Sequence, residues 1–202
     1  MYDLYRNIII IISPLIIGLG ILNLFLTNRD YRGHQHRSKC TSMLCLVYHE
    51  MYVGLTSSSA WFSTLPFFIE DKYLNIHLFF YSLGGLLTLI SISMYLMYLF
   101  KMKSIKRALG RNPDKLVTEG IYNKSRNPQS LARALGLIGL GIWGRSFHAL
   151  LLALVWIVIN HPFILIEENF LVAIFGKRYL EYCSETPRYF GILSPIKKLV
   201  KN

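Results

Sequence analysis

The sequence Leu116-Val117-Thr118-Glu119-Gly120-Ile121-Tyr122 leads through Ser125-Arg126-Asn127-Pro128 into a glycine-rich apolar segment that ends at Glu167-Glu168. Polar and aromatic residues follow, among them Tyr179, Tyr182 and Pro187-Arg188. An apolar hairpin that crosses a membrane and returns brings the segments on either side of it to the same face. We therefore expect a site at one membrane surface, built from residues 116–128 and 167–188.

Composition indicates an all-α, polytopic membrane protein. The chain has 202 residues, of which 53% are hydrophobic and only 16% are charged, whereas soluble domains carry about 25% charged residues. The net charge of +11 could suggest nucleic acid, but the basic residues lie between apolar runs, where they set topology and contact anionic lipid. We expect no nucleic-acid partner, and a single integral-membrane domain that covers residues 1–202.

The apolar runs predict a bundle of about five membrane-spanning helices. The expected spans are residues 7–26, 43–69, 76–100, a fourth that begins at 127–128, and 147–166. Residues 29–39, 101–115 and 177–201 are rich in Lys and Arg, which favours the cytoplasm for these segments. The N-terminus is then outside and the C-terminus cytoplasmic. The first run is interpreted as a retained anchor, because no small-residue cleavage site follows it.

This order divides the chain into two parts. Residues 1–100 contain three N-terminal spans, and residues 101–202 contain the expected site, with the last two spans as a helical hairpin followed by a cytoplasmic C-terminal helix. The three cysteines, Cys40, Cys45 and Cys183, are expected to be free thiols. His34 and His36 lie in a basic loop without carboxylates, so we expect no metal site.

His49 and Glu50 are ionisable residues inside the second expected span. Such residues are costly at membrane depth and are therefore candidates for a substrate site. The alternative is that both lie near the cytoplasmic end of the helix and only satisfy a neighbour.

Asn127-Pro128 has the pattern of a helix start, because asparagine is a favoured N-cap and proline is favoured at the first helical position. The free N–H groups of this helix end, beside Arg126, would suit an anion; Asn127 could equally be a cap alone. Further along, Ala132, Gly136 and Gly139 share a face, for which helix packing is favoured over contact with a flat ligand.

Glu167 and Glu168 lie where the fifth expected span emerges. Adjacent residues on a helix point about 100° apart, so the two acids should face different partners. Glu168, Val172, Phe175, Tyr179 and Tyr182 have helical spacing and form one expected stripe. A solvated helix end is the alternative.

These residues together resemble a known family. The pattern from Leu116 to Pro128, followed about forty residues later by Glu167-Glu168, Phe175-Gly176, Tyr179, Tyr182 and Pro187-Arg188, resembles the isoprenylcysteine carboxyl methyltransferase and phospholipid methyltransferase superfamily. These are integral-membrane enzymes that use S-adenosylmethionine. The resemblance covers roughly the C-terminal 90 residues.

The resemblance implies an S-adenosylmethionine site between the segment before the fourth span and the helix after the fifth. Its implied cofactor-binding residues are Tyr122, Arg126, Asn127, Pro128, Gln129, Glu167, Glu168, Tyr179, Tyr182 and Arg188, of which Arg126, Glu167 and Glu168 are the catalytic candidates. Arg126 and the helix N-terminus suit the cofactor carboxylate, and Glu167 or Glu168 suits its ammonium or ribose hydroxyls.

The chain also departs from the family pattern. Asn127, Ser130 and Ala132 stand where His, Tyr and Gly are usual, and Phe163 and Ile164 occupy the region where an arginine often precedes the glutamate pair. These departures leave open a pocket reshaped for another acceptor, or weak cofactor binding.

The methyl acceptor is expected to be lipidic, most simply a prenylcysteine-type carboxylate, which is already ionised. A phosphatidylethanolamine-type amine would first have to lose a proton, and a small thiol is a further alternative. Two other classes remain: a membrane reductase of related architecture that binds a nicotinamide cofactor, and a non-catalytic protein that binds lipid. The sequence does not indicate an oligomeric state.

Overall fold

The computed structural model describes residues 2–32, 38–66, 74–102 and 115–191 as a bundle of long helices. The helices are α1 (Tyr2–Arg32), α2 (Lys39–Trp61), α3 (Leu74–Met102), α5 (Pro128–Trp143), α6 (Phe147–Phe175) and α7 (Lys177–Glu185), with a short 3-10 helix, η1 (Gly120–Asn123). Within these ranges there is no strand, only an isolated bridge between Pro66 and Ser146. The predicted all-α class is confirmed.

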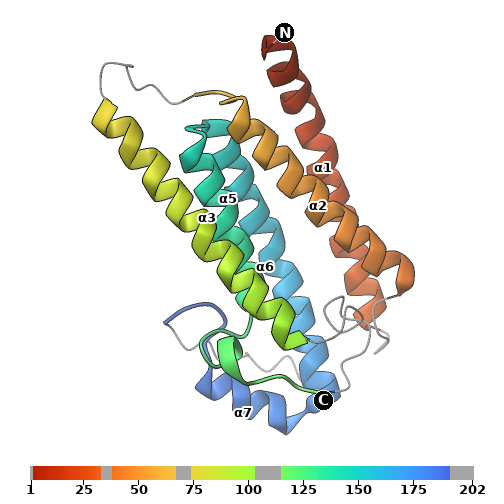
Figure 1. Cartoon of the computed structure of the whole chain (residues 1–202). Helices are drawn as coiled ribbons and strands as arrows, with labels where there is room; N and C mark the ends of the chain where they lie inside the picture. The colour runs from red at the N-terminus through yellow and green to blue at the C-terminus, as the bar shows by residue number, and fades with distance from the viewer. Residues whose placement is uncertain (1, 33–37, 67–73, 103–114, 192–202) are drawn as a thin grey trace.

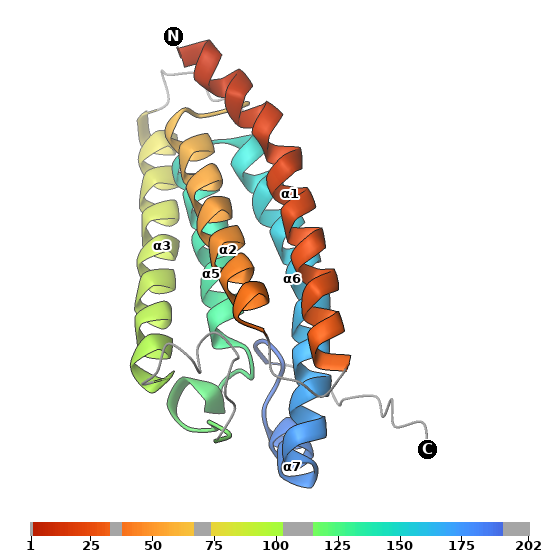
Figure 2. The ribbon, with the colours of Figure 1, turned by 90° about the vertical axis from the view of Figure 1, so that its right-hand side faces the viewer.

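The five long helices α1, α2, α3, α5 and α6 run alternately down and up, and η1 and α7 lie at the lower end (Figure 1). Turned by 90°, the bundle shows α3 at the left, α2 in front of α5, and α1 alongside α6 (Figure 2). Among the residues that the structure describes, three helices are long and apolar enough to cross a membrane: α1, α3 and α6. Membrane crossing by α2 and α5 stays a prediction.

The second expected span, residues 43–69, was placed too far along the chain. The helix runs from Lys39 to Trp61, and the Phe62 N–H caps it by bonding to the Ser58 carbonyl. Ser63 and Leu65 then adopt positive φ angles of 42° and 50°, which a continuing helix does not allow. The end of that prediction, residues 67–69, lies outside the described residues.

Glycines bring α3 and α5 into backbone contact. A Cβ placed on Gly84 of α3 would meet the backbone of Gly139 and Trp143, and one on Gly136 of α5 would meet the Ser91 side chain. The prediction that the small-residue face of α5 serves helix packing is confirmed. This contact fixes α5 against α3 and so fixes the position of its N-terminal end, where Asn127 lies.

The outer face of the bundle is apolar, as the membrane interpretation requires. Ile11, Leu15, Phe25, Leu89 and Val158 are all well exposed, although an exposed apolar surface of this kind is unfavourable in water. Inside the bundle, α1, α2, α5 and α6 share a hydrophobic core. Its largest fully buried side chains are Trp156, Tyr48, Tyr52 and Leu137. The structure therefore fits a bilayer as its solvent.

The helix that carries the acidic pair is longer than predicted. The expected fifth span ended at Ile166, whereas α6 continues to Phe175 and breaks at Gly176, whose φ is +53°. The chain then turns into α7, where Tyr179, Tyr182 and Cys183 are buried against Leu116. Val172 and Phe175 pack on the same cluster, so the predicted stripe is confirmed as a buried face, but it is shared between two helices.

Candidate functional site

The two polar segments on either side of the α5–α6 pair meet at the lower end of the bundle. The Arg126 N–H donates to the Pro187 carbonyl at 2.9 Å, and the Tyr182 hydroxyl donates to the Tyr122 carbonyl at 2.7 Å. Each bond joins residues about sixty positions apart. The expected proximity of residues 116–128 and 167–188 is therefore present in the structure.

Glu168 lies at the centre of this junction. Its Oε2 accepts from Nη2 of Arg188 at 2.8 Å and from Nε of Arg188 at 3.0 Å. Its Oε1 lies 3.4 Å from Nε of Arg126. The side chains of Glu168 and Arg126 are 3% and 0% exposed, so one buried carboxylate is shared by two guanidinium groups. The group of three carries one net positive charge.

Asn127 occupies the N-cap position of α5, as predicted, but its side chain makes no capping bond. Its Nδ2 instead lies 3.4 Å from Glu168 Oε1 and donates to the Arg188 carbonyl at 3.3 Å. The hydroxyl of Ser125 accepts from the Asn127 N–H at 3.2 Å and donates to the Arg188 carbonyl. The turn before α5 is thus fastened to the segment after α7, because both converge on Glu168 and Arg188.

Three tyrosines close the cluster from below. Burial raises the pKa of Tyr122, Tyr179 and Tyr182 above the ordinary value for a phenol, so all three remain protonated donors at neutral pH. The hydrogen bonds to Glu168 raise the pKa of Arg188, which therefore remains a cation.

Gln129 and Glu167 supply the acceptor groups of the site. The Gln129 Oε1 is buried and has no hydrogen-bond partner within the described part of the chain. Glu167 is half-buried, one residue from Glu168 but on another side of α6, and its charge acts on the Tyr122 phenol. Pro128 is the first residue of α5 and is buried. A ligand with both an anionic group and N–H or O–H donors fits this set of groups.

The substrate candidates His49 and Glu50 point in different directions. His49 packs edge-on against Trp156 of α6, with ring centroids 5.9 Å apart. Glu50 is exposed on the outside of α2. The two residues are adjacent in sequence but do not form a pair, since adjacent helical positions face about 100° apart.

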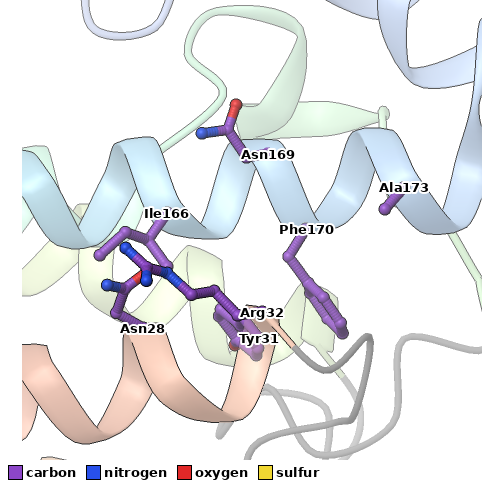
Figure 3. A pocket seen from close by; sticks show the side chains of 7 residues that line it. All are labelled: Asn28, Tyr31, Arg32, Ile166, Asn169, Phe170 and Ala173. Carbon is purple, nitrogen blue, oxygen red and sulfur yellow. The ribbon is translucent and has the colours of Figure 1, made fainter. Parts of the chain in front are cut away.

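A cavity of about 320 Å³ lies between the end of α1 and the lower half of α6 (Figure 3). It is lined by Asn28, Tyr31, Arg32, Ile166, Asn169, Phe170 and Ala173. Tyr31 and Phe170 stack there, with ring centroids 4.1 Å apart. None of the predicted cofactor residues lines this cavity, so it is distinct from the Glu168 cluster.

Sequence reasoning missed one charged residue inside the bundle, Arg133 of α5. Its guanidinium lies 5.3 Å from the ring centroid of Tyr95 and 5.9 Å from that of Trp156. The signal was available, because a lone cation in an otherwise apolar helix is as unusual as the His49-Glu50 pair.

Comparison with known proteins gives a match to one family that spans about half of the chain. Residues 79–178 match the phospholipid methyltransferase family. A stretch of 86 residues is 35% identical to the "Cobalt-zinc-cadmium resistance protein CzcN" of Cupriavidus metallidurans. That match covers 42% of this chain and spans 39% of the relative's length.

Proposed function

Because residues 79–178 make this chain a member of the phospholipid methyltransferase family, within the isoprenylcysteine/phospholipid methyltransferase superfamily, we propose that it transfers a methyl group from S-adenosylmethionine to a lipidic acceptor. The observation that carries the proposal is the buried Glu168, which links Arg126 and Arg188 from the two polar segments. With the N-terminus outside and the C-terminus in the cytoplasm, the reaction takes place at the cytoplasmic membrane surface.

The residues of the junction fit S-adenosylmethionine by charge and by hydrogen-bonding type. The net positive charge of Arg126, Arg188 and Glu168 suits a carboxylate. The Gln129 Oε1, which has no hydrogen-bond partner among the described residues, and the carboxylate of Glu167 are acceptors for an ammonium or a hydroxyl. When bound, the cofactor supplies an electrophilic methyl group on a sulfonium.

Each residue then has a definite task. Arg126 binds the cofactor carboxylate, and Glu167 and Gln129 accept from the ammonium or ribose hydroxyls. Glu168 is held by both arginines and by Asn127, so it acts as a positioning residue. Tyr122, Tyr179 and Tyr182 exclude water from below. Methyl transfer is an in-line displacement, so holding the two reactants aligned supplies most of the catalysis.

A prenylcysteine-type carboxylate is the acceptor we propose first, because it is already ionised and needs no base. The match to the phospholipid methyltransferase family favours a second candidate, the amine of a phospholipid. An amine must lose a proton before it attacks, and Glu167, whose charge acts on the Tyr122 phenol, is the acid that we propose to accept it. Either acceptor would enter sideways from the bilayer.

Titration of the detergent-purified protein with S-adenosylhomocysteine tests the cofactor assignment. Micromolar affinity for this product, together with no binding of reduced nicotinamide cofactors, is the expected result. Binding of the nicotinamide alone would select the reductase class. Binding of neither would select a non-catalytic membrane protein and would overturn the proposal.

A further inference from the structure

Arg133 is a cation inside the bundle that is not part of the cluster formed by Glu168, Arg126 and Arg188. It is half-buried on α5, and its Nη2 donates to the Tyr95 hydroxyl of α3 at 3.3 Å. Its guanidinium also stacks near Trp156 of α6. Across residues 2–32, 38–66, 74–102 and 115–191, no carboxylate forms an ion pair with it. The contacts with the two rings offset part of the cost of burying this charge.

The groups around Arg133 are rich in hydrogen-bond donors and poor in acceptors. The indole N–H of Trp156 can only donate; its side chain is 1% exposed, and its Nε1 has no partner among the described residues. The Tyr95 oxygen already accepts from Arg133, so its own O–H remains able to donate. The Arg133 guanidinium therefore lies beside the Tyr95 phenol and the Trp156 ring, and no carboxylate of the described residues is ion-paired with it. Such a group of donors suits an anionic oxygen group.

The position of Arg133 relates this cluster to the proposed reaction. It is five residues beyond Pro128, about 7.5 Å further along the axis of α5. The Glu168 cluster lies at the beginning of the same helix. A group bound at Arg133 would thus lie deeper in the bundle than the cofactor site, as the polar part of a lipid would if its apolar chains remained in the bilayer.

We propose that Arg133, Trp156 and Tyr95 form an anion-binding subsite that holds a phosphate or carboxylate oxygen of the methyl acceptor and so determines acceptor specificity. This inference rests on the proposed function for the identity of the ligand as an acceptor. The subsite itself is a property of the three side chains. A neutral lipid, or a small thiol without an acidic group, would bind poorly because it leaves the guanidinium without a counter-charge.

Native mass spectrometry of the detergent-purified protein can measure lipid retention without turnover. The phosphate arm compares phosphatidylethanolamine with diacylglycerol, and the carboxylate arm compares N-acetyl-S-farnesylcysteine with its methyl ester. We expect the wild type to bind the member that carries the anionic group, the phosphate or the free carboxylate, at least tenfold more tightly in at least one arm. That arm identifies whether the ligand is a phosphate or a carboxylate. Equal binding within both pairs would overturn the subsite.

The variants Arg133→Gln and Trp156→Phe test which residues are responsible. Arg133→Gln should reduce anionic binding to the level of the neutral lipid, and Arg133→Lys should restore part of it. Trp156→Phe keeps a ring but removes the N–H donor, and should weaken anionic binding several-fold. The matched control is Arg145→Gln, because Arg145 also lies over a tyrosine ring, that of Tyr81, but in the turn between the end of α5 and the start of α6.

The affinity for S-adenosylhomocysteine separates this inference from the proposed function. Arg133→Gln should leave that affinity within twofold of the wild type, which also shows that the variant is folded. If Arg133→Gln binds the lipid with the phosphate or carboxylate as tightly as the wild type does, the subsite is overturned, whatever the affinity for S-adenosylhomocysteine. If the wild type does not bind S-adenosylhomocysteine, that result counts against the methyltransferase proposal alone, since lipid retention is measured independently.

Discussion

Arg188 donates two hydrogen bonds to one oxygen of Glu168, at 2.8 and 3.0 Å, and thereby ties the segment after α7 back to the lower half of α6. The other oxygen of Glu168 faces Arg126, in the turn before α5. A single buried acid thus organises three separate parts of the chain. Removing one partner of a buried ion pair leaves an uncompensated charge, and this explains the first prediction.

Glu168→Gln should destabilise the protein strongly. Two guanidinium groups would lose their shared carboxylate, and breaking a buried pair in this way costs about 3–5 kcal/mol. We expect a clearly lower thermal midpoint in detergent and the loss of S-adenosylhomocysteine binding. Glu181→Gln is the control, because its ion pair with Lys177 is exposed and is worth little. Equal midpoints for the two variants would mean that Glu168 does not hold the junction together.

Glu167→Lys should weaken cofactor binding without the same loss of stability. Glu167 is half-buried and is not part of the ion pairs of Glu168. Charge reversal places a cation where we expect the cofactor ammonium or hydroxyls, so calorimetry should show at least a tenfold weaker affinity for S-adenosylhomocysteine. Glu185→Lys, at an exposed position of α7, should bind normally. Unchanged affinity in Glu167→Lys removes this acid from the site.

Two adjacent glycines of α3 should differ sharply on substitution by alanine. The new Cβ of Gly84→Ala would meet the backbone of α5, whereas that of Gly85→Ala has nothing within 4 Å. Overpacking of this kind costs about 1–3 kcal/mol, so Gly84→Ala should lower the thermal midpoint and Gly85→Ala should not. The close α3–α5 contact would be refuted if both variants melted like the wild type.

The cysteines offer a test of burial in the same chain. None of the three forms a disulfide, and Cys40 is exposed whereas Cys183 is buried in α7. Burial raises the pKa of the Cys183 thiol, so a smaller fraction is thiolate at pH 8, and thiolate is the species that reacts. Mass spectrometry after iodoacetamide treatment should show Cys183 modified at least tenfold more slowly than Cys40, with its rate rising as the pH is increased. Equal rates would contradict the packing of α7.

Local patterns in the sequence predicted much of the fold. The long apolar runs gave α1, α3 and α6, and Asn127-Pro128 marked the start of α5, because these features depend on neighbouring residues alone. The end of α2 was predicted too late, since apolar residues continue after Trp61 and outweighed the signal of Ser63, Thr64 and Pro66, where the backbone angles turn. The extension of α6 beyond Ile166 was missed because hydropathy marks only the apolar part of a helix, whereas α6 continues through polar residues to Phe175.

The site was predicted as a set of residues but not as a network. That the two motifs meet follows from a returning hairpin, and the structure has this contact between Arg126 and Pro187. Whether Glu167 or Glu168 contacts both arginines depends on the rotation of α6 about its axis. That rotation is set by tertiary packing, which a sequence motif does not encode. The position of Arg133 beside Trp156 was hidden for the same reason, because the two residues lie on different helices.

Transfer of a labelled methyl group tests the central claim most directly, namely that the two motifs form one S-adenosylmethionine site that serves a lipid. Membranes containing the wild-type protein would be incubated with methyl-labelled S-adenosylmethionine, and the lipid extract would be analysed by mass spectrometry. We predict a labelled lipid that is heavier than its precursor by one methyl substitution, and its absence with Glu167→Lys. A lipid fraction without label, in membranes whose protein still binds S-adenosylhomocysteine, would contradict the account.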